Sequence, residues 1–447
     1  MNLGFIISTI KLKSKELIRK KVLQNFILVS GVTLFISILG FFKETVVAAN
    51  FGLSLQLDTF YVAILIPGVI NSVFLNSFKS VFIPNYINEV GIKGNIGSFQ
   101  TTSLFITVFV SLFFAVITYL STNTFLELLY PDKSLEFYLL VKEQLPILLF
   151  AIFFWGLAST LGALLNVNDE YRFSSFAGVF TPLFILLSIF LFKEHYENTL
   201  LAWGTTLGAF ASCLYLLIVA KNKKIIVLGK PDYQNNNIKI AFKQLPAKIS
   251  SGLLTALNSV VDQFFAAQLV VGSIAALNYG LKIPAFLSSL LLVAMGNVLL
   301  PYFTKLVLSN RKLAFENLFK NIKWVFIGLV AITIFGILLS DFIVALLFER
   351  KEFTTEDTQV VSTIQKIFLA YIPFKITGMI MINFATSINK NSIMAYISFV
   401  ALILNLILDY IFIEMYGIFG IALCTTIITV LKSMTMYWYL NRLKTRE

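Results

Sequence analysis

Long apolar stretches, separated by short polar connections, run along nearly the whole chain. Each is about 20 residues long, which is the length that an α-helix needs to cross the hydrocarbon core of a membrane. Strands of an outer-membrane barrel are about ten residues long and alternate in polarity, so these stretches predict helices. Twelve spans are expected, at residues 26–46, 59–78, 99–120, 145–165, 173–192, 200–219, 249–270, 277–300, 324–347, 364–388, 394–413 and 416–436.

A long polar connection at residues 221–245 divides these spans into two sets of six, and the two sets resemble each other. Ile66-Pro67 and Ile83-Pro84 in the first half are separated by the same interval as Ile283-Pro284 and Leu300-Pro301 in the second. An even number of spans in each half predicts a parallel repeat, with two lobes around a central cavity that opens to alternate sides. We expect an N-terminal lobe at 1–220 that includes an amphipathic interfacial helix at 3–21, a cytoplasmic linker at 221–245, and a C-terminal lobe at 246–447.

Composition supports an all-α polytopic membrane protein. Hydrophobic residues make up 58% of the chain and charged residues only 13%, whereas a soluble domain carries about 25% charged residues. Most of the 35 lysines and arginines fall in the N-terminal tail, in residues 221–248 and in the other connections on that side. Both termini are therefore predicted to be cytoplasmic. The net charge of +12 is then a signal of topology and of contact with anionic lipids, and no nucleic-acid partner is expected.

Several classes of chemistry find no support in the sequence. The two cysteines lie inside apolar stretches and the chain has one histidine, which argues against a disulfide framework, a metal site and histidine catalysis. No P-loop, nucleophile elbow or HExxH helix is present. We therefore expect neither an enzyme nor a bound cofactor. The glycine pair Gly204 and Gly208 predicts close packing of helices.

Charged residues inside spans are costly, about 2.5–3.5 kcal/mol each on insertion scales, so they are candidates for a functional site. Four of them are deep in their spans and are expected to face a hydrated cavity: Lys43, Asp262, Lys282 and Lys375. The alternative for Lys43 is a structural ion pair with Asp58. The remaining intramembrane charges are Glu44, Lys366, Asp409 and Lys432, and asparagines such as Asn71 could hydrogen-bond either a sugar or a neighbouring helix.

The first two spans also carry motifs of a known family. The segments LGFFKETVVAANFG at 39–52 and LDTFYVA at 57–63, followed by Ile66-Pro67 and Phe82-Ile83-Pro84, resemble the opening of the MurJ/MviN lipid II flippases. Residues 158–166 with Arg172-Phe173, and 299–301, resemble later parts of that family. The resemblance implies the two-lobe fold of the multidrug/oligosaccharidyl-lipid/polysaccharide exporter superfamily, which also contains the MATE transporters. Twelve spans fit the O-antigen and capsule-unit flippases of this superfamily equally well.

Together these features predict a flippase in the bacterial cytoplasmic membrane. Its expected substrate is an undecaprenyl-diphosphate-linked glycan, either lipid II or an O-antigen or capsule repeat unit, moved by alternating access. Lys43, Lys282 and Lys375 would attract the diphosphate, Asn71 would contact the cavity's ligand, and Asp58 would gate the cavity or pair with Lys43. Asp262 is the candidate site for a coupled proton or Na⁺, with the membrane potential as another driving force. Membrane lipids and enzymes of cell-envelope biosynthesis are the other expected partners.

Two alternatives remain. A multidrug/cation antiporter of the same superfamily would have an anionic, aromatic cavity, whereas the deep charges here are mainly lysines. A membrane glycosyltransferase or polysaccharide polymerase would need a large outer loop with catalytic carboxylates, and Glu349 and Asp357 are the candidates in the loop after the ninth span.

Overall fold

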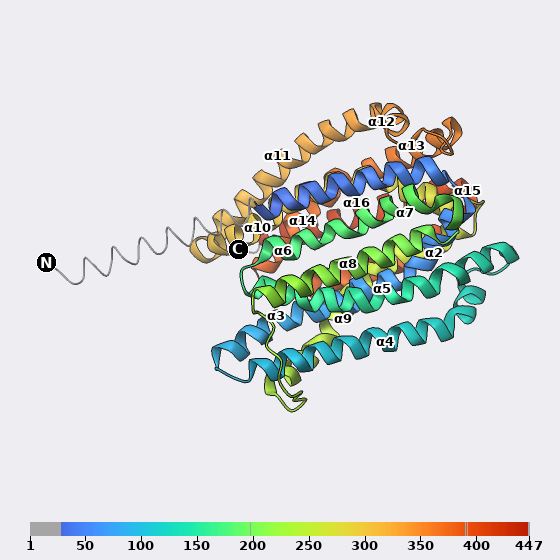
Figure 1. Cartoon of the computed structure of the whole chain (residues 1–447). Coiled ribbons are helices and arrows are strands. Elements are labelled where there is room, and N and C mark those ends of the chain that lie inside the picture. The colour runs from blue at the N-terminus through green and yellow to red at the C-terminus, as the bar shows by residue number, and fades with distance from the viewer. Residues whose placement is uncertain (1–27, 197, 389, 391, 446–447) are drawn as a thin grey trace.

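The computed structural model describes residues 28–196, 198–388, 390 and 392–445. Throughout this part of the chain long helices run side by side, and the first described residues and the C-terminus lie at the same end of the bundle (Figure 1). Eleven helices of the described residues are long and apolar enough to cross a membrane. The expected interfacial helix at 3–21 lies outside the described residues.

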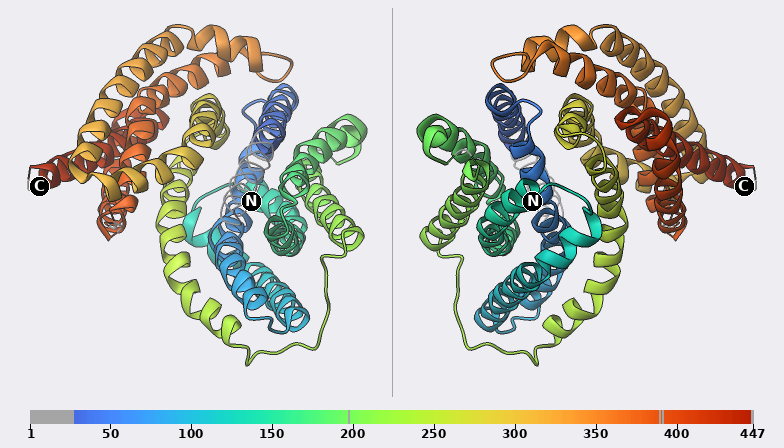
Figure 2. Two further views of the ribbon diagram at one scale, coloured as in Figure 1. Left: turned by 90° about the vertical axis from the view of Figure 1, so that its left-hand side faces the viewer. Right: turned by 90° about the vertical axis from the view of Figure 1, so that its right-hand side faces the viewer.

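Helices of the first half form one lobe and those of the second half form the other, as the blue-to-green and yellow-to-red halves of Figure 2 show. The N-terminal lobe begins with the helix Leu28–Phe51. It continues with α2 (Leu55–Val69), the π-helix η1 (Ile70–Leu75), α3 (Asn76–Gly91), α4 (Ile96–Leu129), α5 (Leu135–Val167), α6 (Tyr171–Phe176), the 3₁₀ turn η2 (Ala177–Val179), α7 (Phe180–Tyr196) and α8 (Leu200–Asn222).

The C-terminal lobe is built from a second series of helices. Its helices are α9 (Asn236–Ala267), α10 (Ser273–Ser309), α11 (Arg311–Leu338), α12 (Ser340–Phe348), α13 (Thr355–Leu369), α14 (Ile372–Ser387), α15 (Ser392–Tyr416) and α16 (Ile418–Lys444). The two-lobe, all-helical fold expected from the sequence is confirmed. Of the twelve expected spans, the one at 249–270 corresponds to the later part of α9, a helix that is not among the eleven apolar candidates.

The second span is a continuous helix with a π-helical centre. Pro67 lies in α2 and Pro84 in α3, and between them η1 carries Asn71. Isolated π-helical turns inside longer helices are rare and occur frequently at functional sites. The irregular segment therefore falls where the sequence places one of its candidate contact residues.

A close contact of α7 and α8 explains the glycine pair of the sixth span. A Cβ atom at Gly208 would lie 2.6 Å from the Cα atom of Thr181, and one at Gly204 would lie 2.8 Å from the Cα atom of Ile185. Small residues allow this approach, which gives intramembrane helices their packing energy. The predicted packing role of the pair is confirmed.

Replacement of Gly208 by alanine should therefore destabilise the lobe. The new methyl group has to displace the backbone of α7, and overpacking of this kind costs about 1–3 kcal/mol. We expect a lower midpoint of thermal unfolding for the purified Gly208→Ala protein in detergent. Gly328→Ala is the matched control, because nothing lies within 4 Å of a Cβ atom at that position of α11; equal midpoints for the two variants would contradict the packing role.

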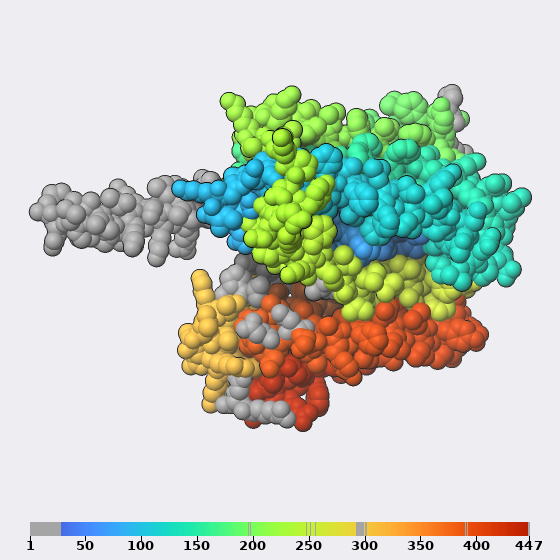
Figure 3. All heavy atoms as spheres, turned by 90° about the horizontal axis from the view of Figure 1, so that it is seen from below, coloured from blue at the N-terminus to red at the C-terminus, as the bar shows by residue number. Residues whose placement is uncertain are grey.

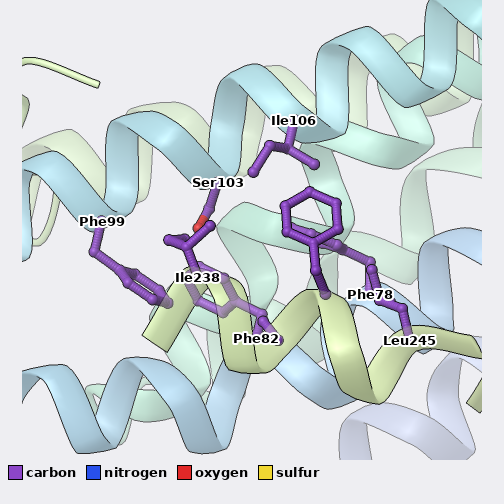
Figure 4. A pocket seen from close by; sticks show the side chains of 9 residues that line it. Phe78, Phe82, Phe99, Ser103, Ile106, Ile238 and Leu245 are labelled. Atoms are coloured by element: carbon purple, nitrogen blue, oxygen red, sulfur yellow. The ribbon is translucent and has the colours of Figure 1, made fainter. Parts of the chain in front are cut away.

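The connection between the lobes is shorter than the sequence predicts. The expected linker at 221–245 includes the end of α8, which runs to Asn222, and the first turns of α9, which begins at Asn236. These first turns pack on the N-terminal lobe, where Ile238 contacts the cluster that contains Phe82 and Phe99. A small cavity remains between α3, α4 and α9 (Figure 4). The polar residues at 236–245 are helical because Asn235 caps the start of α9, and a capped helix is compatible with a polar sequence.

Candidate functional site

The two lobes meet at one end of the bundle and lie apart at the other. In Figure 3 they are separate toward the left and come together toward the right. Two hydrogen bonds join them at the closed end: the Glu352 backbone N–H donates to the Ala49 carbonyl at 3.3 Å, and the Lys133 side-chain Nζ donates to the Leu269 carbonyl at 3.4 Å. The predicted cytoplasmic location of both termini would make this an inward-open state.

A cluster of three charged residues bridges the lobes. Glu44, in the Leu28–Phe51 helix, accepts hydrogen bonds from Lys43 of the same helix and from Lys282 of α10, whose Nζ lies 2.8 Å from Glu44 Oε1. The Glu44 side chain is only 11% exposed. Because two ammonium groups share one carboxylate, the cluster carries a net positive charge in a poorly solvated place, where electrostatic attraction for an anion is strong.

Asp58, near the start of α2, makes a different contact between the lobes. Its carboxylate accepts hydrogen bonds from the backbone N–H groups of Gly272, at 2.7 Å, and Ala275, at 2.8 Å. These groups lie at the N-terminus of α10, where unpaired N–H donors and the helix dipole favour a negative charge. The expected pairing of Asp58 with Lys43 is thus wrong for this state, because each of the two side chains has another partner.

Loss of the Asp58 carboxylate should loosen the closed end. Asp58→Ala leaves two N–H donors of α10 without their acceptor, and removal of such a cap costs about 0.5–2 kcal/mol. We expect an approximately fivefold larger population of molecules with separated lobes at this end. Spin labels on cysteines at Asp132 and Val271, one in each lobe, would report it as a longer distance in pulsed electron paramagnetic resonance.

Asp58→Asn is the matched control, because its amide oxygen can still accept one of the two hydrogen bonds. Its effect should be smaller than that of Asp58→Ala. An unchanged distance distribution in the alanine variant would show that the Asp58 contact does not hold the lobes together.

A second polar cluster lies entirely within the C-terminal lobe. Asp262 of α9 accepts hydrogen bonds from Asn405 of α15, at 3.2 Å, and from Thr425 of α16, at 3.0 Å. The Asn405 amide nitrogen also donates to Asp409 Oδ2 at 2.9 Å. Asp409 is fully buried. The buried Asp409 and the partly buried Asp262 share one amide and lack a full positive counter-charge among the described residues, which is unfavourable unless a proton or cation binds there.

The other candidate residues stand apart from these two clusters. Lys375 of α14 lies over the ring of Tyr371, 5.0 Å from its centroid, and is partly buried. Asn71 is half-buried on η1, and no hydrogen bond of its side chain occurs among the described residues. The structure thus brings Lys43 and Lys282 together, places Asp262 in a separate cluster, and leaves Lys375 and Asn71 outside both.

Sequence reasoning placed too few residues in these clusters. Glu44 and Asp409 were recognised as intramembrane charges but were not assigned to a site. Asn405 and Thr425 were not recognised as partners of Asp262. The signal for Asn405 and Asp409 was their separation of four residues, which places both side chains on one face of a helix. No local pattern identifies Glu44 as the shared partner, because Lys282 is distant in the sequence.

The loop carboxylates named for a catalytic alternative have structural partners. Glu349 accepts hydrogen bonds from the hydroxyl groups of Thr358 and Thr355, which hold the pKa of its carboxyl below the usual value. Asp357 and Thr354 form a reciprocal capping box at the start of α13. Both carboxylates therefore stabilise the turn between α12 and α13.

Comparisons with known proteins agree on one family. A protein-family model described as "Lipid II flippase MurJ" matches residues 47–446. A probable lipid II flippase MurJ of Buchnera aphidicola subsp. Baizongia pistaciae is 24% identical, with 93% of this chain and 83% of that protein covered. The Helicobacter pylori strain J99 protein of the same description is 26% identical, with 84% of this chain and 86% of that protein covered.

Solved structures show the same fold. The structure described as lipid II flippase MurJ in an inward closed conformation has a TM-score of 0.80 at 23% identity and covers 93% of this chain and 87% of its own. An inward-facing multidrug-resistance MATE transporter has a TM-score of 0.78 at 13% identity and covers 94% of this chain and 98% of its own. The matched segment extends over most of the chain and includes both lobes. This protein is therefore an inner-membrane member of the MurJ flippase family.

Proposed function

We propose that the protein moves lipid II, an undecaprenyl-diphosphate-linked glycan, from the cytoplasmic to the outer leaflet. Family membership supports the reaction class, and the cluster of Lys43, Glu44 and Lys282 carries the proposal, because it combines excess positive charge with a position between the lobes. The polyprenyl chain stays in the lipid while the polar headgroup crosses between the lobes.

In this proposal the diphosphate competes with Glu44 for the two lysines. The approaching anion offers more negative charge than one carboxylate, and the ammonium groups act as point charges without the bidentate geometry of arginine. Once Lys43 and Lys282 bind the diphosphate, the bond from Lys282 to Glu44 no longer joins the lobes at this point. Substrate binding thereby biases the protein toward the opposite, outward-open state.

The remaining candidate residues contribute further along the headgroup. Lys375 supplies another positive charge from the C-terminal lobe, and Asn71 offers an amide donor and acceptor from η1 that have no partner among the described residues. Neutral amide groups suit the hydroxyl and acetamido groups of a sugar, because they can both donate and accept hydrogen bonds.

Coupling to an ion is assigned to the cluster of Asp262, Asn405, Asp409 and Thr425. Carboxylate, amide and hydroxyl oxygens are suitable ligands for Na⁺, and the same carboxylates could instead bind a proton. Movement of one charge across the membrane supplies about 2.3 kcal/mol per 100 mV. Either ion would therefore let the membrane gradient drive the return of the lobes.

A leaflet-exchange assay tests the proposed reaction. The purified protein is reconstituted in vesicles with a fluorescent lipid II, and enzymatic access to the glycan measures its appearance in the outer leaflet. We expect exchange that depends on the protein and falls at least about tenfold in Lys43→Gln, because one of the two cations at the diphosphate is lost. Lys351→Gln, in the exposed loop before α13, is the matched charge control.

Three outcomes separate the alternatives. Exchange of an O-antigen or capsule unit, with no exchange of lipid II, would contradict the proposed substrate while retaining the flippase reaction. Exchange of no polyprenyl-diphosphate-linked glycan would contradict the function itself. Extrusion of cationic drugs by the same vesicles would favour the multidrug antiporter.

A further inference from the structure

The segment between the lobes, residues 223–235, lies along the side of the N-terminal lobe instead of crossing free solvent. Figure 2 shows it passing around the edge of this lobe from α8 to α9. We call this segment the strap. Three consecutive side chains of α4 bind its backbone: Gln100 accepts from the Val227 N–H at 2.8 Å, Thr101 from the Gly229 N–H at 3.0 Å, and Thr102 from the Asp232 N–H at 2.8 Å.

The contact is too close to allow much rearrangement. A Cβ atom at Gly229 would lie 2.7 Å from the backbone nitrogen of Ser98 and 2.8 Å from the carbonyl carbon of Gly97. The glycine crossing and the three hydrogen bonds fix the direction of the neighbouring side chains. Leu228 and Tyr233 consequently remain 70% and 58% exposed.

The level of the strap along α4 places it beside the membrane. At the start of the span expected at 99–120, Gln100 to Ser103 are polar and the apolar run begins only at Leu104. Gln100 to Thr102 therefore lie about 3–6 Å before this run at 1.5 Å per residue. The polar headgroup layer extends about 5–7 Å beyond the hydrocarbon core on each side. Exposed side chains of the strap thus lie at headgroup depth, where leucine and tyrosine can bury their apolar atoms.

Charge around the strap favours one kind of lipid. Lys221, Lys224 and Lys230 are exposed and have no carboxylate partner among the described residues, whereas Lys223 pairs with Glu170 at 2.7 Å. Asp232 is the one acidic residue of the strap. Basic residues next to exposed apolar side chains are the pattern of a segment that binds an anionic membrane surface.

We propose that the strap, together with Lys221 at the end of α8, is a membrane-interfacial anchor. Lys221, Lys224 and Lys230 bind anionic phospholipid headgroups while Leu228 and Tyr233 enter the headgroup layer. The occupant of this surface is the anionic phospholipid of the leaflet at the end of the bundle where α4 begins. The anchor is separate from the charged clusters between the lobes, and it does not depend on which substrate the protein carries.

An environment-sensitive fluorophore on Leu228→Cys tests the anchor in the full-length protein. The two native cysteines are buried, so the introduced thiol can be labelled selectively. Vesicles contain phosphatidylcholine with or without phosphatidylglycerol, and brominated lipids serve as quenchers. We expect about twofold quenching at Leu228→Cys, increased by phosphatidylglycerol, and loss of that increase when Lys221, Lys224 and Lys230 are replaced by glutamine.

Ile92→Cys is the matched control. Ile92 is also 70% exposed, but it precedes Ile96, which itself lies about 12 Å from Leu104 along α4, so its probe should remain in water. Tyr233→Cys provides a second probe if Leu228→Cys does not fold. Equal quenching at the strap and at Ile92→Cys would overturn the proposal. Strap quenching that does not increase with phosphatidylglycerol would also contradict it, as would a strap probe that is quenched only by water-soluble quenchers.

Discussion

Glu44→Gln should abolish most transport and separate the lobes at their closed end. Glutamine has nearly the same shape but no charge, so Lys43 and Lys282 lose the counter-ion that they share. Removal of one partner from a buried ion pair costs about 3–5 kcal/mol. Since this bond joins the two lobes, we expect the population with separated lobes to rise about a hundredfold. Pulsed electron paramagnetic resonance measures that population, and leaflet exchange measures transport.

A double-mutant cycle distinguishes this effect from general destabilisation. Lys282→Gln removes the other half of the bridge, and the double variant leaves Lys43 as the only charge of the cluster. We expect a coupling free energy between Glu44 and Lys282 of about 1–3 kcal/mol, as for contacting charges. Additive effects of the two substitutions would show that the bridge does not control the separation of the lobes.

Asp262→Asn should remove the response of the protein to the coupling ion. The cluster then retains one carboxylate, Asp409, and its amide and hydroxyl neighbours. A ligand present at a hundred times its dissociation constant stabilises a folded protein by about 2.7 kcal/mol. We expect the native protein to unfold at a higher temperature in Na⁺ than in K⁺, or with a change of pH if the ion is a proton, and the variant to lose this difference.

Two further variants make that result specific. Thr425→Val removes one hydroxyl from the cluster and should weaken the response without eliminating it, because the carboxylates remain. Asp357→Asn changes a carboxylate in the exposed capping box of α13 and should leave the response intact. If the native protein and Asp262→Asn respond identically to Na⁺, K⁺ and pH, the cluster is not the coupling site.

The fold could be predicted from the sequence because a membrane-spanning helix is determined by the residues of its own segment. Within the hydrocarbon core each span must satisfy its own backbone hydrogen bonds, so length and apolarity alone define it. Eleven of the twelve expected spans match helices that are long and apolar enough to cross a membrane, and the glycine pair in α8 marks a real close contact. The boundary of α9 was not predictable in this way, because its polar first turns are stabilised by packing on the N-terminal lobe.

The same distinction between local and long-range causes applies to the functional sites. The sequence identified Lys43, Lys282, Asp58 and Asp262, because a charge inside a span is costly wherever it points. Which of them meet depends on contacts between distant segments: Glu44 with Lys282, Asp58 with the N-terminus of α10, and Asp262 with Asn405.

Sequence alone therefore determined that this protein is a two-lobe membrane bundle with a few costly intramembrane charges. Hydrophobic length and charge are properties of each residue and its neighbours, so they can be read along the chain. Only the tertiary structure decided the partners of those charges, because electrostatic and hydrogen-bonding energies fall off within a few ångströms. The packing of the helices sets those distances, and it gave Lys43 and Asp58, whose ion pair was one alternative, separate partners.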